Sequence, residues 1–214
     1  MNPLSVPQSS LEKMILTQIN LQEEINIQIH AAWRTQHNPW FRAIWTECAE
    51  MLDHVGWKWW KKKTPQPDQV KLEIVDIWHF GLSALLQNEQ DHFKLTKDIV
   101  AAFLDRPSAP NQDIVSIIEL LAAHALTEKM FCLATFNQLL IASDFSHDEL
   151  FRHYVGKNIL NGFRQKKGYK DGTYRKTWHG REDNEHLAEL VNEIDINDAA
   201  FTEKLEAALE ARYL

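Results

Sequence analysis

The chain has 214 residues, of which 44% are hydrophobic and eight are tryptophan, and its formal net charge is −7 at pH 7. This length and apolar content favour a folded chain with a substantial core and exclude an intrinsically disordered one. The acidic balance argues against a general nucleic-acid binder.

The spacing of apolar residues predicts an almost entirely helical chain with weak strand signals. Asn38-Pro39 supplies an N-cap and a first-turn proline, Gly56 stops that helix, and Arg106-Pro107 ends a later one. Ser146 and Glu149 form a capping-box pattern that starts another helix. The predicted helices cover about residues 10–30, 39–55, 68–87, 94–104, 114–142, 146–162 and 184–213.

Two acidic pairs stand out, Glu47-Cys-Ala-Glu50 and Glu73-Ile-Val-Asp76, each within a predicted helix. At i,i+3 spacing both side chains of a pair project from one helical face, so two such helices side by side would gather four carboxylates. No Lys or Arg lies three or four positions from any of the four. Hard divalent ions with oxygen ligands, Mg²⁺ or Mn²⁺, suit such a group. An ordinary solvated acidic face is the alternative.

The stretch from Arg152 to Arg181 is strongly basic, with nine Lys or Arg against one acid, and it holds five of the seven glycines. Glycines let backbone amides approach an anion, and Lys and Arg neutralise phosphate oxygens. No Walker or Rossmann pattern is present. The segment therefore indicates a polyphosphate ligand, with a solvated basic tail as the alternative.

A second basic and aromatic cluster, WKWWKKK, occupies residues 57–63, directly after the first acidic pair. An aromatic side chain near a metal site can stack on a base or wall off a sugar. Core packing by the three tryptophans is the alternative.

Four motifs together resemble the dimeric all-α dUTPases, a branch of the all-α nucleoside triphosphate pyrophosphatases. The resemblance runs from about Leu21 to Asn184 and covers most of the chain. Its motifs are LQEEIN at 21–26, ECAEMLDHVGWKWWK at 47–61, LEIVDIWHF at 72–80 and KxxLNxxRxxxGYKxGxYxKxWxGxEDN at 157–184.

The resemblance implies a single all-α domain over residues 1–214, a helical bundle with an antiparallel core of metal-binding helices that forms a homodimer. It implies hydrolysis of dUTP, and of dUDP, to dUMP with Mg²⁺, at two or more ions per site and with Mn²⁺ as a substitute. Attack falls on the β-phosphorus in this family. The basic segment at about 156–184 would be mobile and close over the nucleotide.

Site residues follow from the motifs by position. Glu47, Glu50, Glu73 and Asp76 match the metal ligands, and Glu47 is favoured as the residue that orients or deprotonates the attacking water. Gln22 and Asn26 match the uracil-reading positions, whereas the residues alone would leave them as ordinary polar positions on an amphipathic helix. The remaining nucleotide-binding positions are Trp59, His79, Lys157, Asn161, Arg164, Tyr169, Lys176 and Asn184.

Three other functions are open on the sequence. A related pyrophosphatase that prefers dCTP or several nucleotides would share the metal chemistry. A di-iron carboxylate bundle needs Glu-x-x-His motifs, and Asp76-Ile-Trp-His79 has the spacing but Asp53 stands where the other helix needs His. A helical nucleic-acid-binding module would use the two basic clusters.

Location and origin rest on weaker signals. The N-terminus lacks a basic start followed by an apolar run, and no 18-residue apolar span follows, so we expect neither secretion nor a membrane span. The two cysteines, Cys48 and Cys132, fall in apolar helical contexts, which fits a reducing cytoplasm. A cellular and a viral source fit the sequence equally.

Overall fold

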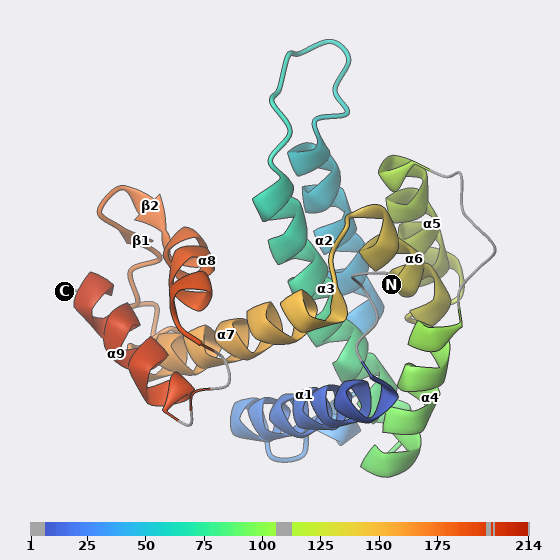
Figure 1. Ribbon diagram of the computed structural model, residues 1–214, viewed down its shortest axis with the longest axis horizontal. Helices are drawn as coiled ribbons and strands as arrows, with labels where there is room; N and C mark the ends of the chain where they lie inside the picture. Colours follow the sequence, from blue (N-terminus) through green and yellow to red (C-terminus); the bar gives the residue numbers. More distant parts are fainter. Residues whose placement is uncertain (1–6, 106–112, 196–197, 199, 214) are drawn as a thin grey trace. The chain divides into compact units, whose positions relative to one another are not determined.

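The structure, a computed structural model, describes residues 7–105, 113–195, 198 and 200–213 (Figure 1). These residues are mainly helical, with one 3₁₀ turn and one two-stranded hairpin. The elements are α1 (Gln8–Ile29), η1 (Trp33–Gln36), α2 (Trp40–Val55), α3 (Pro67–Asn88), α4 (His92–Leu104), α5 (Ile114–Thr127), α6 (Leu133–Ala142), α7 (His147–Lys166), β1 (Thr177–Trp178), β2 (Arg181–Glu182), α8 (Asp183–Glu193) and α9 (Phe201–Tyr213). The predicted all-α class is confirmed.

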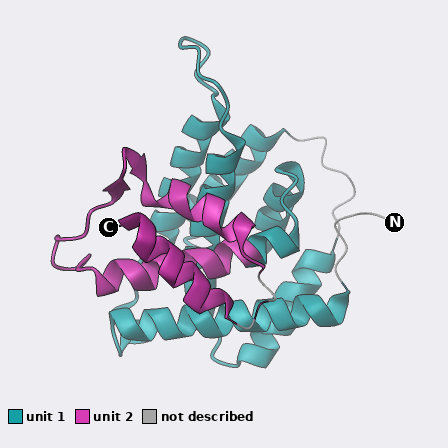
Figure 2. Cartoon of the chain, turned by 60° about the vertical axis from the view of Figure 1, so that its left-hand side comes forward, with its two compact units in different colours: residues 1–151 teal, residues 152–214 magenta. Residues whose placement is uncertain are grey.

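The chain divides into two compact units, residues 1–151 and residues 152–214, with the boundary inside α7 (Figure 2). Each unit is described by itself. The expectations of a single domain and of a mobile segment at about 156–184 stay predictions. Among the described residues, no helix combines the length and hydropathy that crossing a bilayer requires.

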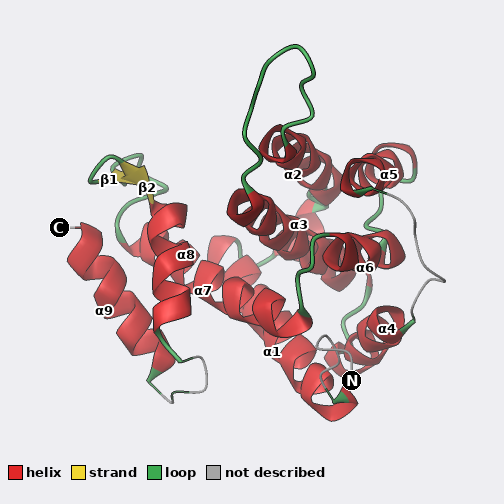
Figure 3. Cartoon of the chain, turned by 45° about the horizontal axis from the view of Figure 1, so that its top comes forward, coloured by secondary structure: helices red, strands yellow, loops and turns green. Residues whose placement is uncertain are grey.

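In the first unit, α2 packs mainly against α3 and α5, while α1 packs against α4 and α3. The views in Figures 1 and 3 both show α2 and α3 running side by side, joined by the loop that follows Gly56. The predicted end of α2 is confirmed, because Gly56 adopts a left-handed φ of 81° at the C-cap. The predicted start is wrong by one position: Pro39, and not Asn38, is the N-cap residue, and no side chain caps this end. The two helices that carry the acidic pairs are therefore neighbours.

An aromatic cluster in the core fixes the position of α3. Trp78 is fully buried and stacks on Phe136 with ring centroids 5.0 Å apart, and Phe103 and Phe131 pack against the same indole. A Cβ at Gly81 would lie 2.7 Å from the Phe131 ring. Glycine at this position is what lets that ring lie against α3.

The single helix predicted over residues 114–142 is wrong. It is divided into α5 and α6, with Lys129 in the left-handed region at φ 59°. The turn places Phe131 in the core, only 6% exposed. The stretch predicted as one helix over 184–213 is likewise two helices, α8 and α9. The predicted end of the fourth helix at Arg106-Pro107 lies outside the described residues.

The second unit has its own hydrophobic core, which α7, α8, α9 and Trp178 of β1 build together. The hairpin pairs Thr177 with Glu182 and Trp178 with Arg181, around a two-residue turn in which both residues have positive φ. Helix α9 contacts the basic segment through Tyr213. The ring of Tyr213 stacks on that of Tyr174 in the segment, with centroids 5.6 Å apart and planes 6° apart.

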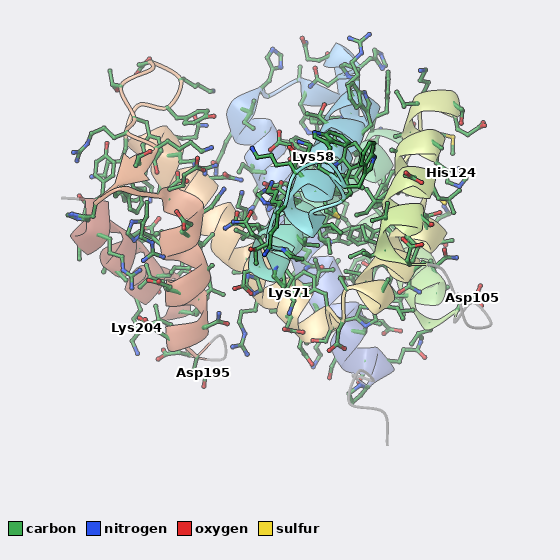
Figure 4. All side chains as sticks on the ribbon, turned by 90° about the horizontal axis from the view of Figure 1, so that it is seen from above. Lys58, Lys71, Asp105, His124, Asp195 and Lys204 are labelled. Carbon is green, nitrogen blue, oxygen red and sulfur yellow. The ribbon has the colours of Figure 1, made fainter. Side chains whose placement is uncertain are left out.

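The capping box that opens α7 is confirmed. The Glu149 carboxylate accepts hydrogen bonds from the Ser146 backbone N–H at 3.0 Å and from its hydroxyl at 2.9 Å, and Ser146 Oγ accepts from the Glu149 N–H at 3.2 Å. Lys71 of α3, labelled in Figure 4, donates to Glu149 at 3.0 Å. This bond ties the start of α7 to α3.

Candidate functional site

Three of the predicted metal ligands meet where α2 and α3 pack together. Glu47, Glu73 and Asp76 each offer a ligand oxygen, and these oxygens lie within 4.8 Å of one another. Glu73 is buried and the other two are half-buried. Three carboxylates this close repel strongly unless a proton or a cation lies among them. The donor set fits a hard divalent cation with oxygen ligands.

The protonation of Glu47 reflects this crowding. Burial raises the pKa of the Glu47 carboxyl to about 8, helped by the negative charge of Asp76 and by a hydrogen bond to Glu73. The Glu47 carboxyl thus gives up its proton less readily than an ordinary glutamate does. The arrangement shows that the group cannot hold its full negative charge unaided.

Glu50, the fourth predicted ligand, is exposed and lies outside this group of three. Its charge still contributes to the raised pKa of Glu47. Its role as a metal ligand therefore stays a prediction.

His54 is a neighbour of the acidic group that the sequence prediction left out of the site. Its Nε2 lies 3.4 Å from Oε1 of Glu73, and its Nδ1 lies 3.0 Å from Oε1 of Gln66. The signal was present in the sequence, because His54 follows Glu47 by seven positions and Glu50 by four, so all three share one face of α2.

A buried network of polar side chains joins α1 to α3. Gln22 Nε2 donates to Asn26 Oδ1 at 3.1 Å and to Ser83 Oγ at 2.9 Å, and Asn26 Nδ2 donates to Ser83 Oγ at 3.1 Å. His79 Nδ1 lies 2.8 Å from Gln22 Oε1. The structure thus brings three predicted nucleotide-binding residues together and adds Ser83. The i+4 spacing from His79 to Ser83 could have indicated this.

An ion pair beside this network, which we call the clamp, joins α1 to η1 and α3. Arg34 of η1 pairs with Glu23 through two hydrogen bonds of 2.5 Å, and its Nε donates to the Leu86 carbonyl at 3.2 Å. The Trp33 indole N–H donates to the same carboxylate at 3.2 Å. Because Glu23 follows Gln22 directly, the clamp also fixes the register of the carboxamides against α3.

The tryptophans of the loop after Gly56 are exposed, so core packing is excluded for them. Trp57 is 44% exposed, Trp59 88% and Trp60 57%, and the three rings meet edge to face. Lys58, labelled in Figure 4, pairs with Asp53 at 2.6 Å. The contribution of Trp59 to nucleotide binding stays a prediction.

In the second unit, four of the predicted phosphate-binding residues form one network. Lys157 Nζ donates to Asn184 Oδ1 at 3.0 Å, and Arg164 donates to the same oxygen at 3.2 Å. Arg164 also donates to Asn161 Oδ1 at 3.1 Å. The motif that stretches from Lys157 to Asn184 in sequence is therefore compact in space.

Asp183 lies within this network and was not predicted as a site residue. Burial alone would raise the pKa of its carboxyl, but two hydrogen bonds and the charge of Arg164 hold that pKa below its ordinary value. The Tyr174 hydroxyl donates to the same carboxylate at 2.7 Å. Asp183 thus fixes the orientation of the Arg164 guanidinium.

The last two predicted residues lie at the edge of this network. Tyr169 is 52% exposed, and its backbone N–H donates to the Arg164 carbonyl at 3.0 Å. Lys176 pairs with Glu182 at 3.1 Å. Burial lowers the pKa of Lys176, but the hydrogen bond and charge of Glu182 outweigh it and raise the pKa above its ordinary value.

The profile of the dUTPase family matches residues 8–169. The chain belongs to the dUTPase family. The matched span holds all four predicted metal ligands and ends at Tyr169, so Lys176 and Asn184 lie beyond it. A search of curated proteins found no match. Membership of the dUTPase family argues against a di-iron bundle and against a nucleic-acid-binding module.

Proposed function

We propose that this protein is a dUTP diphosphatase that hydrolyses dUTP, and also dUDP, to dUMP. The observation that carries the proposal is the group formed by Glu47, Glu73 and Asp76 at the packed faces of α2 and α3, in a chain that matches the dUTPase family over residues 8–169. A polyphosphate is the substrate class that such an acidic metal site serves.

The metal ligands are Glu47, Glu50, Glu73 and Asp76, and the metal is Mg²⁺, at two or more ions per site, with Mn²⁺ as a substitute. Bound Mg²⁺ lowers the pKa of water and neutralises phosphate oxygens. Two features support this assignment: the donors are all carboxylate oxygens, and the raised pKa of Glu47 reflects negative charge that a cation would offset.

Glu47 in its carboxylate form takes the proton of the attacking water. The water oxygen bonds to the β-phosphorus, and the bond from that phosphorus to the α,β-bridging oxygen breaks. The bridging oxygen leaves with dUMP, and dUTP gives pyrophosphate as the second product. The closeness of Glu47 to Glu73 and Asp76, within 4.8 Å, together with its raised pKa, is what supports its choice as the base.

Gln22, Asn26 and His79 read the uracil, and Trp59 covers the base and sugar. The phosphate groups are bound by the basic network of the second unit, from Lys157, Asn161, Arg164, Tyr169, Lys176 and Asn184. Hydrogen bonds among these side chains support a preorganised set of donors.

The protein acts as a homodimer in the cytoplasm. The dimer is supported by large apolar side chains that stay exposed on two helices packed against each other, Trp45 of α2 and Leu120 and Leu126 of α5, which are 37%, 38% and 47% exposed. Sedimentation analysis is expected to give twice the monomer mass, and Leu126→Glu is expected to give monomers.

The activity is tested with a nucleotide panel. Purified protein with Mg²⁺ is expected to release pyrophosphate from dUTP far faster than from dCTP, dTTP or UTP, and EDTA is expected to abolish release. Preference for dCTP would replace the dUTP assignment with that of a related pyrophosphatase.

A further inference from the structure

We propose that Ser83 sets the base selectivity of this site by fixing the orientation of the Gln22 and Asn26 carboxamides. The inference rests on the proposed function for the identity of the base. It assigns Ser83 as a positioning residue, which acts through the two amides.

The Ser83 hydroxyl is saturated with hydrogen bonds. It is 0% exposed, and its oxygen accepts from Gln22 Nε2 at 2.9 Å and from Asn26 Nδ2 at 3.1 Å. Its single hydrogen goes to the His79 carbonyl at 3.1 Å or to Asn26 Oδ1 at 3.3 Å. A hydroxyl has one donor and two acceptor sites, and all three are used.

This bonding allows one orientation of the two amides. With both nitrogens on Ser83, Gln22 Oε1 faces His79 Nδ1 and Asn26 Oδ1 accepts from Gln22. If both amides rotated by 180°, the Gln22–Asn26 bond would survive and His79 could change tautomer. Ser83 would then face two carbonyl oxygens with one hydrogen, and one oxygen pair would repel. The hydroxyl therefore favours the observed arrangement of the amides over the rotated one.

Amide orientation matters because uracil and cytosine differ in which ring positions donate a hydrogen bond and which accept one. Uracil offers a donor at N3 and an acceptor at position 4, whereas cytosine offers an acceptor at N3 and a donor at position 4. Rotation of a carboxamide exchanges its donor and its acceptor. A fixed amide therefore discriminates between the bases, and an amide free to rotate accepts both.

The test is the ratio of kcat/KM for dUTP to kcat/KM for dCTP, measured with Mg²⁺ on the full chain. Ser83→Ala removes the hydroxyl, and Ser83→Cys fills the space with a weak acceptor. Both variants are expected to move the ratio at least about tenfold toward one, because kcat/KM falls more for dUTP than for dCTP.

The matched control is Thr96→Val. Thr96 is 5% exposed, and its hydroxyl donates to the carbonyl four residues earlier, His92, at 2.7 Å, as the Ser83 hydroxyl does to His79. This variant is expected to leave the ratio unchanged. Equilibrium binding of dUMP and dCMP gives the same comparison without turnover.

A merely structural role would lower the values for both nucleotides together. An unchanged ratio in Ser83→Ala and Ser83→Cys would overturn the proposal. The dUTP assignment is judged separately, on wild type. If wild type prefers dCTP, the dUTP assignment fails. The role of Ser83 is still decided in that case, because Ser83→Ala and Ser83→Cys are expected to move the ratio toward one whichever base wild type prefers.

Discussion

Arg164 and Asp183 form a two-point ion pair, in which Nε and Nη2 of the guanidinium each lie 2.8 Å from one carboxylate oxygen. The Asp183 side chain is 0% exposed and that of Arg164 is 12% exposed. The guanidinium that we propose to bind phosphate is thus held in a fixed plane before any ligand arrives.

Asp183→Asn is expected to destabilise the second unit by about 3–5 kcal/mol, because it leaves the charge of Arg164 buried without its counter-ion. KM for dUTP is expected to rise, since the guanidinium loses its fixed orientation. Urea unfolding and steady-state kinetics measure the two effects. Lys166→Gln is the control: it removes an exposed pair with Glu206 and should change stability by less than about 1 kcal/mol. Equal effects from the two variants would contradict the account.

The Asp183 pair also predicts a pH dependence. Because Arg164 holds the pKa of Asp183 below its ordinary value of 3.8, the stabilising contribution is fully present above the pKa of the unfolded side chain. It is lost as the pH falls through the lower folded pKa. The difference in unfolding free energy between wild type and Asp183→Asn is therefore expected to be constant from pH 7 to about pH 5 and to shrink below pH 4. A difference that persists at pH 2 would show that the pair does not titrate.

Asp76→Asn is expected to have opposite effects with and without metal. Removing one of the three crowded carboxylates relieves their repulsion. The free energy of unfolding of the metal-free protein is therefore expected to rise by about 1–3 kcal/mol. With Mg²⁺ at 100 times its dissociation constant, metal binding is expected to raise the free energy of unfolding of wild type by about 2.7 kcal/mol. The variant is expected to show no such rise. Thermal unfolding with EDTA and with Mg²⁺ measures both. Glu50→Gln, at an exposed position outside the group of three, should shift the metal-free protein less than Asp76→Asn does.

Tyr213→Ala is expected to raise KM for dUTP about threefold to tenfold, because its ring supports Tyr174, whose hydroxyl bonds Asp183, and an aromatic pair contributes about 0.5–1.5 kcal/mol. Tyr213→Phe keeps the ring and should behave as wild type. A rise in KM for Tyr213→Phe as large as that for Tyr213→Ala would show that the stacking is irrelevant.

The acidic helices could be predicted because their signals are local. Pro39 and Gly56 mark the ends of α2, and the i,i+3 spacing places each acidic pair on one face. The break between α5 and α6 could not be predicted, because no glycine or proline marks it. Lys129 adopts its positive φ where burial of Phe131 against Gly81 requires a turn.

The same distinction between local and long-range signals applies to the candidate site residues. The grouping of Glu47, Glu73 and Asp76 could be predicted from their spacing and from the absence of neighbouring cations. Asp183 was missed because its importance lies in a partner far along the chain, Arg164, 19 positions away. Ser83 bonds residues 57 and 61 positions away, and its one local signal was the i+4 spacing from His79. Such long-range pairs leave no periodic trace in the sequence.

The most direct test compares Mg²⁺-dependent release of pyrophosphate from dUTP by wild type and by Glu47→Gln, both confirmed as folded by thermal unfolding. The account predicts an active wild type that EDTA silences and a variant at least about 100-fold slower. Undiminished activity in Glu47→Gln would remove Glu47 from the reaction.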